Sequence, residues 1–350
     1  MNNKNEYIKK AFIAMSNQSE LYRSSKFWED ACVKISRNIL DAGFENFRRD
    51  EDNLNFFVPT YGPPGNSFSE SAIEELLISS SKKESKKTFL TQKNFLTGEL
   101  SAYSDYRVFK AAQKDNDILN LSSFSESSFG NPKESFKFEE NLFSRSSLNY
   151  LLGLSFLKKI VPNFLPKTVL EIGGGFGTLG EILYQIPNTQ IKYIDIDLPP
   201  IFSVAHEYLK NSCEENEDNF FLSSLEPNDV IDIENLPLFS FLPSWEIKKL
   251  TGTIDLFVNF ISFQEMEPEI VQNYLSIVSN LQAKFILLRN LREGKQKATS
   301  KSTGVISPVS HKHYSKFLPA YELIGKNVCP FGYSTVDGFN SELLVFKRKD

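Results

Sequence analysis

The most informative stretch of the chain is glycine-rich and reads VLEIGGGFGTLGE at residues 169–181. It follows an apolar run and precedes a helical pattern, which is the position of a turn between a strand and a helix. In an open α/β sheet, ligands bind at such a turn. Glycine has no Cβ and accepts positive φ, so a ligand can approach the main chain closely. The sequence therefore predicts a ligand site at this turn. The glycines expected to contact the ligand are Gly173, Gly174, Gly175 and Gly177.

Charged residues near the turn indicate the kind of ligand. Residues 175–180 satisfy the GxGxxG pattern of dinucleotide sites, and a carboxylate follows about 20 residues later. However, Glu171 would place a like charge beside a pyrophosphate, whereas a ligand with an ammonium group would find a partner there. S-adenosylmethionine carries an ammonium, a sulfonium and no phosphate, and Asp195 or Asp197 can accept hydrogen bonds from its ribose hydroxyls. We therefore favour this cofactor and keep an NAD(P)-dependent oxidoreductase as the alternative.

Two stretches resemble a known superfamily. VLEIGGGFG at 169–177 and KYIDIDLPP at 192–200 resemble motifs I and II of the Rossmann-like, seven-stranded class of S-adenosylmethionine-dependent methyltransferases, a resemblance that covers roughly residues 145–350. It implies S-adenosylmethionine as the cofactor and places the ribose-binding acid on Asp197 rather than Asp195. The predicted cofactor-binding residues are Glu171, Gly173, Gly174, Gly175, Gly177, Asp195, Asp197 and Asn259.

Three shorter strings narrow the resemblance. FGNP at 129–132, SFQEM at 262–266 and FNSEL at 339–343 are similar to strings in sugar O-methyltransferases found with bacterial surface-polysaccharide genes. The resemblance implies methyl transfer to a hydroxyl of a small-molecule sugar, a nucleotide sugar or a glycan. A catalytically silent partner subunit that keeps the fold and the cofactor site is a further alternative.

Methyl transfer is an in-line displacement, so the protein mainly has to align the acceptor oxygen and exclude water. A sugar hydroxyl is a poor nucleophile until it begins to lose its proton, so we expect a general base. Glu265, which follows the fourth expected strand, is the first candidate, although it could instead stabilise the N-terminus of the helix that begins near Pro268. His311 and His313 follow a polar stretch at 292–304 and are the other candidates, with a solvated histidine pair as the alternative.

The composition of the chain limits which partners, metal sites and cellular compartments are expected. The 350 residues are 41% hydrophobic and 24% charged, which is typical of a globular protein, and the net charge of -5 counts against nucleic acid as the main partner. Cys32, Cys213 and Cys329 form no CxxC pair, so neither a disulfide framework nor a zinc site is expected. No acidic or histidine cluster has metal-ligand spacing, so no metal is predicted. Without a run of 18 apolar residues or a signal peptide, we expect a cytoplasmic protein with no membrane span.

The hydrophobic pattern divides the chain into two parts. Residues 1–143 read mainly as helices and residues 144–350 as alternating strands and helices. Such alternation predicts a mostly parallel sheet with helices on both faces, and the resemblance implies that this sheet is Rossmann-like with seven strands. We expect the last two of these strands, at the end of the chain, to pair as a hairpin. The aromatic-rich N-terminal helices need a surface to bury, so we expect them to pack near the carboxyl edge of the sheet and to form part of the substrate site.

Overall fold

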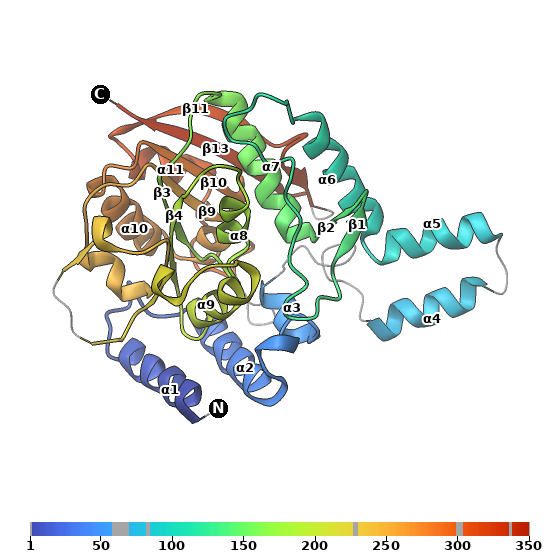
Figure 1. Ribbon diagram of the computed structural model, residues 1–350, viewed down its shortest axis with the longest axis horizontal. Helices are drawn as coiled ribbons and strands as arrows, with labels where there is room; N and C mark the ends of the chain where they lie inside the picture. The colour runs from blue at the N-terminus through green and yellow to red at the C-terminus, as the bar shows by residue number, and fades with distance from the viewer. Residues whose placement is uncertain are drawn as a thin grey trace.

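The structure, a computed structural model, describes residues 2–57, 70–81, 85–226, 230–298, 304–335 and 338–349. Within these residues lies one large sheet of nine strands (Figure 1). The strands are β3 (Thr168–Ile172), β4 (Lys192–Asp197), β5 (Phe220–Leu222), β7 (Phe239–Pro243), β9 (Leu256–Phe260), β10 (Phe285–Leu291), β11 (Tyr321–Asn327), β12 (Tyr333–Ser334) and β13 (Asn340–Arg348). Two short pairs lie outside the sheet, β1 (Phe136–Phe138) with β2 (Asn141–Phe143) and β6 (Ile231–Asp232) with β8 (Leu250–Thr251).

The strand order places a ligand site at β3. Across the sheet the order is β11-β13-β10-β9-β3-β4-β7-β5, with β12 beside β13. The strands from β10 to β5 are parallel, and β13 is antiparallel to both β10 and β11. The chain runs outward from β3 through β4 and later returns to β9 on the other side of β3. Strand order therefore reverses at β3, and ligands of open α/β sheets bind at the carboxyl ends of the strands at such a point.

The predicted α/β class, with a mostly parallel sheet and an antiparallel terminal pair, is confirmed, but the strand count differs. Strand β7, which lies between β4 and β5, is not predicted from the sequence. The reason is that the described residues between β5 and β7 hold only the short 3-10 helix η3 (Ile233–Asn235) and the two-residue β6, so strand and helix do not alternate there. The two-residue β12 is too short to leave a pattern in the sequence.

Both faces of the sheet are covered by helices. One face is covered by α7 (Arg145–Ile160), α8 (Thr178–Tyr184) and α9 (Ile201–Ser212), and the other by α10 (Pro268–Asn280) and α11 (His311–Phe317). Successive side chains of a strand point to opposite faces. Val169 and Tyr193 therefore pack on the side of α7, α8 and α9, and Leu170 and Ile194 pack on the side of α10 and α11. The central strands β3, β4, β7 and β9 are buried on both sides, so they read as mainly apolar runs.

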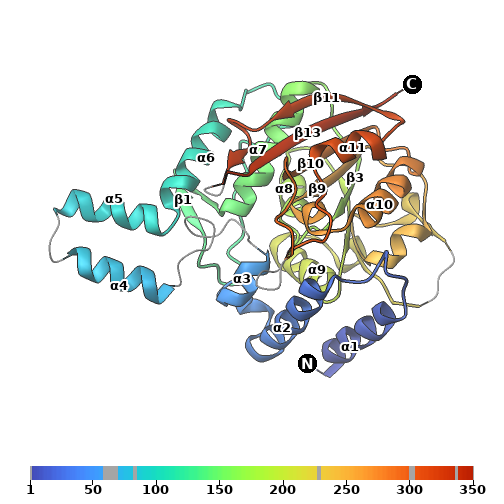
Figure 2. The ribbon, with the colours of Figure 1, turned by 180° about the vertical axis from the view of Figure 1, so that it is seen from behind.

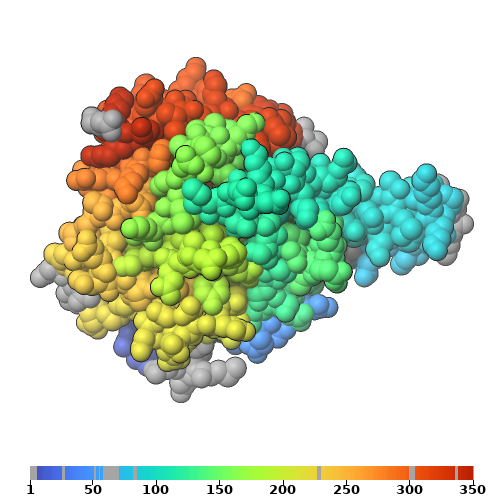
Figure 3. Space-filling model, turned by 45° about the horizontal axis from the view of Figure 1, so that its top comes forward, coloured from blue at the N-terminus to red at the C-terminus, as the bar shows by residue number. Residues whose placement is uncertain are grey.

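The N-terminal region is mainly helical, as expected. Its helices are α1 (Asn2–Ser16), α2 (Lys26–Ala42), α3 (Glu51–Phe57), α4 (Glu70–Ser81), α5 (Lys86–Leu96) and α6 (Glu99–Ala111). Local signals set the boundaries of α2, because the Ser25 side chain accepts a hydrogen bond from the Trp28 N–H and Gly43 ends the helix with φ of 82°. Helices α1, α2 and α3 lie against the body of the protein, whereas α4 and α5 project away from it (Figure 1, Figure 2, Figure 3).

A fully buried cation joins the N-terminal region to the glycine turn. The Arg48 guanidinium lies 2.6 Å from a carboxylate oxygen of Glu126 and 2.6 Å from one of Glu134. Its central carbon also lies 4.7 Å from the centre of the Phe176 ring, in the middle of the glycine turn. The other carboxylate oxygen of Glu126 accepts a hydrogen bond from Ser147 at the start of α7. Removal of Arg48 would therefore leave two carboxylates buried without their cation.

We expect Arg48→Ala to lower the free energy of unfolding by about 3–5 kcal/mol, because breaking a buried ion pair strands the partner charges. Chemical denaturation measures this change. A matched control is Lys110→Ala, which should lose much less stability, since Lys110 pairs with Glu139 on the surface, where solvent screens the pair. Equal losses in the two variants would contradict the role given to Arg48.

Candidate functional site

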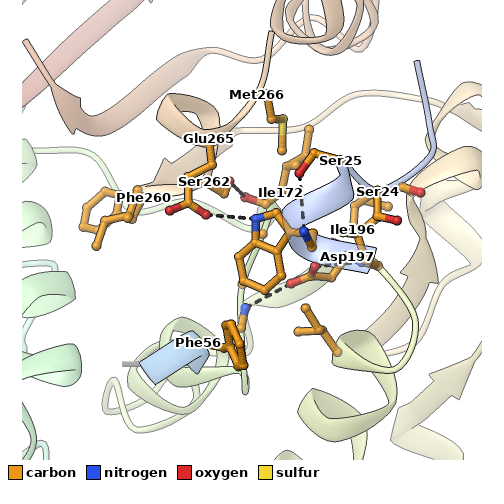
Figure 4. Close-up of a pocket in the computed structure, with 18 of the residues that line it drawn as sticks. Ser24, Ser25, Phe56, Ile172, Ile196, Asp197, Phe260, Ser262, Glu265 and Met266 are labelled. Carbon is orange, nitrogen blue, oxygen red and sulfur yellow. Dashed lines mark hydrogen bonds between the residues drawn. The ribbon is translucent and has the colours of Figure 1, made fainter. Parts of the chain in front are cut away.

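A pocket opens at the carboxyl edge of the sheet, where β3, β4 and β9 end (Figure 4). The glycine turn contributes residues 173–176, and Asp197 comes from the last position of β4. Ser262 and Glu265 come from the 3-10 helix η5 (Ser262–Glu265), which follows β9. The turn that the sequence analysis singles out thus forms one wall of a pocket at the point where strand order reverses.

Two neighbouring glycines of the turn serve different purposes. Gly175 has φ of +62°, and a Cβ added there would meet no neighbouring atom closer than 4.0 Å, so its open side is free for a ligand. A Cβ on Gly174 would instead lie 2.5 Å from a carboxylate oxygen of Asp195 and 2.6 Å from the Tyr193 hydroxyl. Gly174 therefore makes room for buried side chains of the protein, whereas Gly175 leaves space in the pocket.

The other two predicted glycines are also constrained by packing. A Cβ on Gly173 would collide with the side chain of Ser262. A Cβ on Gly177 would lie 3.2 Å from Leu209 of α9, and Gly177 is not among the residues that line the pocket. Gly177 thus lets α8 and α9 approach each other.

Glu171 lies beneath the turn rather than in the pocket wall. Its side chain is fully buried, and its two oxygens accept hydrogen bonds from the hydroxyls of Tyr150 at 2.7 Å and Tyr193 at 2.6 Å. Burial raises the pKa of Glu171 to about 8, although the two tyrosine hydrogen bonds oppose the rise. The predicted direct contact between Glu171 and a ligand ammonium therefore stays a prediction, because Tyr150 lines the pocket and Glu171 does not.

The two candidate aspartates occupy different depths. Asp195 is fully buried and accepts a hydrogen bond from the Gly174 N–H at 3.3 Å, while Asp197 accepts from the Gly175 N–H at 3.1 Å and lines the pocket. Burial raises the pKa of Asp197 to about 7. Burial also raises the pKa of Asp195 well above its ordinary value, as do the negative charges of Asp197 and Glu171. Asp197 is thus the carboxylate that a bound ligand can reach.

Asn259 is buried in the protein rather than exposed to the pocket. Its amide donates a hydrogen bond to the Ile172 carbonyl at 2.9 Å, and its side-chain oxygen accepts from the Phe263 N–H at 3.2 Å and from Asn290 at 3.1 Å. These bonds tie the end of β3 to η5 and β10. Asn259 therefore positions the segment that carries Ser262 and Glu265.

Glu265 lies in the pocket wall (Figure 4), and two other side chains hold its carboxylate. One carboxylate oxygen accepts a hydrogen bond from the Trp28 indole at 2.9 Å, and the other lies 2.5 Å from the Lys295 ammonium. Three segments far apart in the sequence, α2, η5 and the loop after β10, therefore meet at this carboxylate. Glu265 is not the N-cap of α10, because Glu267 occupies that position.

The structure does not bring the two candidate histidines into the pocket. His311 lies 3.2 Å from the Glu342 carboxylate, and the Nδ1 atom of His313 accepts a hydrogen bond from the Ser310 N–H at the N-terminus of α11. Neither is among the residues that line the pocket. The physical reason is that α11 packs against α10 and β11, so its first turn is occupied by capping and by the contact between His311 and Glu342.

The sequence analysis does not identify the aromatic side chains of the pocket. Trp28 from α2, Phe56 and Phe57 from α3, and Tyr150 from α7 line it. Aromatic residues at helical spacing indicate a core-facing side in any helix, and the bond from Trp28 to Glu265 joins residues 237 positions apart. The sequence indicates only that the aromatic-rich N-terminal helices must bury their side chains against another part of the protein. In the structure, α2 and α3 contribute side chains to this pocket.

In the described part of the chain, no group of three or more His, Cys, Asp or Glu side chains is arranged to hold a metal ion. No helix there is long and apolar enough to cross a membrane.

Comparisons with known proteins give likenesses only among solved structures. No protein-family model matches the chain, and no curated protein matches it. The mitomycin 7-O-methyltransferase MmcR has a TM-score of 0.37 and 11% identity, over 93% of this chain and 69% of that chain. The magnesium protoporphyrin IX methyltransferase ChlM from Synechocystis PCC 6803, solved with bound S-adenosylmethionine, has a TM-score of 0.38 and 15% identity, over 59% and 81%. The methyltransferase domain of bacterial CtHen1-C has a TM-score of 0.39 and 13% identity, over 58% and 100%.

The buried carboxyl of Glu171 predicts a pH-dependent stability. Its folded pKa of about 8 exceeds its ordinary value, so between about pH 4.5 and pH 8 the folded state binds more protons than the unfolded state, and stability falls as pH rises. Glu171→Gln stays neutral throughout, so its melting temperature minus that of the parent should increase from pH 5 to pH 8. Thermal unfolding across this range tests the prediction, and a pH-independent difference would contradict it.

Proposed function

We propose that the protein is an S-adenosylmethionine-dependent methyltransferase that methylates a sugar hydroxyl in bacterial surface-polysaccharide or nucleotide-sugar biosynthesis. The observation that carries the proposal is an open glycine beside a carboxylate at the edge of the sheet. Gly175 leaves space for a ligand, and Asp197, which accepts its N–H, lines the same pocket. This pair suits an adenosine whose two ribose hydroxyls donate hydrogen bonds to Asp197.

The charges beneath the turn support a cofactor that carries positive charge. Asp195, Asp197 and Glu171 are all buried there, and burial raises the pKa of each. A ligand with an ammonium and a sulfonium favours the ionised carboxylates, whereas the pyrophosphate of a dinucleotide would add negative charge beside them. The carboxylates therefore favour S-adenosylmethionine over the alternative NAD(P).

The chain's own residues would align the acceptor, exclude water and take its proton. When bound, S-adenosylmethionine supplies a methyl group that its sulfonium has already activated for displacement. The residues of the pocket would hold the acceptor hydroxyl in line with that methyl group, and a base among them would accept the hydroxyl proton. Glu265 is the base that we propose, because it lines the pocket with Asp197.

The aromatic lining supports a sugar as the acceptor. The apolar C–H face of a sugar ring can pack on Trp28 or Phe56, while its hydroxyls reach Ser25 and Glu265 in the same pocket. We propose that residues 1–143 contribute this substrate wall and that residues 144–350 form the cofactor-binding domain.

The cofactor proposal predicts different effects at the two aspartates. Asp197→Asn should weaken S-adenosylmethionine binding about 10- to 100-fold, because hydrogen bonds to a charged group are worth about 1.5–3 kcal/mol. Asp195→Asn is the matched comparison and should weaken binding less, since its side chain does not line the pocket and acts only through its charge. Calorimetry with S-adenosylmethionine and with NAD measures both affinities. Binding of NAD with no binding of S-adenosylmethionine would replace the proposal by an oxidoreductase.

The catalytic proposal predicts a loss of turnover without a loss of cofactor. Glu265→Gln keeps the shape of the side chain but removes its basicity, so turnover should fall about 10²- to 10⁴-fold while S-adenosylmethionine affinity stays nearly constant. The acceptor for this assay comes from mass spectrometry of sugar nucleotides and surface glycans incubated with labelled cofactor. A cofactor-binding protein that methylates no member of such a panel would support the silent partner subunit instead.

Three control variants test whether Glu265 acts through its basicity or through its position in the pocket wall. His311→Asn and His313→Asn should retain turnover, because neither histidine lines the pocket. Trp28→Phe removes the indole N–H that donates a hydrogen bond to Glu265 but leaves the carboxylate, so it should lower turnover less than Glu265→Gln does. If Trp28→Phe and Glu265→Gln lost turnover equally, Glu265 would be holding the pocket wall rather than accepting a proton.

A further inference from the structure

Three carboxyl groups lie together beneath the glycine turn. A Cβ added to Gly174 would lie 2.5 Å from an oxygen of Asp195 and 2.9 Å from one of Glu171, so these two carboxyl groups are neighbours. Asp197, which follows Asp195 by two residues on β4, accepts a hydrogen bond from the N–H of Gly175, the next residue of the turn. Glu171 and Asp195 are fully buried, and Asp197 is 8% exposed. The three acidic groups thus share one site that is nearly closed to water.

The hydrogen-bond donors to these carboxyl groups are uncharged. In the part of the chain that the structure describes, they are two tyrosine hydroxyls and the backbone N–H groups of residues 174, 175 and 198. The second carboxyl oxygen of Asp195 is buried and has no hydrogen-bond partner. Because a buried charge requires a partner charge or a full set of hydrogen bonds, an ionised Asp195 is poorly stabilised in the free protein.

The titratable groups that face the three carboxyls from neighbouring elements supply no positive charge. They are side chains that are neutral when protonated, and burial raises the pKa of each of them: Tyr150 on α7, Tyr193 on β4, Cys32 on α2 and Tyr274 on α10. The carboxyls therefore reduce their mutual repulsion by keeping a proton. In accord with this, burial raises the pKa of Asp197 to about 7 and that of Glu171 to about 8.

The pocket brings the charge of a ligand close to this group. Asp197 lines the pocket (Figure 4), as does Tyr150, whose hydroxyl donates a hydrogen bond to Glu171. Opposite charges attract strongly where water is excluded, so a cation in the pocket favours the ionised carboxyls. S-adenosylmethionine carries one positive charge on its sulfonium and another on its ammonium. Its product, S-adenosylhomocysteine, lacks the sulfonium charge and gains less from the ionised carboxyls.

We infer that Glu171, Asp195 and Asp197 form a proton-linked charge sensor: they hold a shared proton in the free protein and release it to the solvent when S-adenosylmethionine binds. The ionised carboxyls then make the site select the charged cofactor over S-adenosylhomocysteine, which helps the product to leave after methyl transfer. This inference rests on the proposed function, because it requires S-adenosylmethionine as the ligand.

Isothermal titration calorimetry of the full chain, in buffers of different ionisation enthalpy, counts the protons exchanged on binding. The titration is made at about pH 6.5, where the ammonium of the cofactor, with an ordinary pKa of about 7.7–8.0, stays charged. S-adenosylmethionine should release about one proton per molecule bound, so its affinity should rise by up to about tenfold from pH 5.5 to pH 6.5. S-adenosylhomocysteine should release fewer protons, and its affinity should rise less over the same range.

Two variants and a matched control assign the proton to the three carboxyls. Asp195→Asn and Glu171→Gln each remove one titrating group whose side chain does not line the pocket, so each should reduce the proton release and flatten the pH dependence of the affinity. Glu181→Gln is the control, because burial also raises the pKa of Glu181 to about 8, but this carboxyl is bonded to Tyr208 and Ser127 and does not line the pocket. It should keep the full release.

The outcomes distinguish this inference from the proposed function. A chain that does not bind S-adenosylmethionine would overturn the proposed function and the inference with it. Binding without proton release, or with equal release for S-adenosylhomocysteine, would overturn the inference alone. A release that Asp195→Asn or Glu171→Gln retains in full, or that Glu181→Gln loses to the same extent, would place the proton elsewhere and would also overturn it. Either of the first two variants decides the question if the other fails to fold.

Discussion

The buried guanidinium of Arg48 is the interaction on which the geometry of the pocket depends. A cation without water must be matched by carboxylates, and here Glu126 and Glu134 supply them. Through Glu126 the network fixes the first turn of α7, the helix whose Tyr150 reaches Glu171 beneath the glycine turn. The guanidinium also packs against the ring of Phe176, which belongs to the turn itself. The conformation of the turn is therefore set jointly by the N-terminal region and the sheet.

A second constraint follows from the carboxyl groups that lie beneath the turn. Burying Glu171, Asp195 and Asp197 together raises the pKa of each, which is unfavourable for the ionised protein without a ligand. Tyr150 and Tyr193 offset part of this cost by donating hydrogen bonds to Glu171. A positively charged ligand would offset more of it, so these groups favour such a ligand even though two of the three do not touch the pocket.

The sequence predicts those features that local pattern determines. The glycine turn, the parallel sheet and the capped helix α2 all have signals within a few residues, and the preference for Asp197 over Asp195 agrees with which side chain lines the pocket. Features set by tertiary contacts leave no such signal. Strand β7 interrupts the alternation of strand and helix. The spacing of residues in the sequence does not reveal that the side chains of Glu171 and Asn259 are hydrogen-bonded to neighbouring residues. Nor does it reveal that the histidines of α11 lie outside the pocket.

The boundary near residue 143 illustrates the difference between a pattern and a folding unit. Hydrophobic periodicity changes there, yet side-chain bonds cross it at the points that matter most for the pocket: Trp28 bonds to Glu265, and Glu126 bonds to Ser147. Without residues 1–143, Glu265 would lose one of its two partners and the first turn of α7 would lose its carboxylate. The sheet carries the glycine turn and Asp197, but the N-terminal helices complete the walls around them. We therefore regard the two parts as one cooperative structure in which the first part positions the groups of the second.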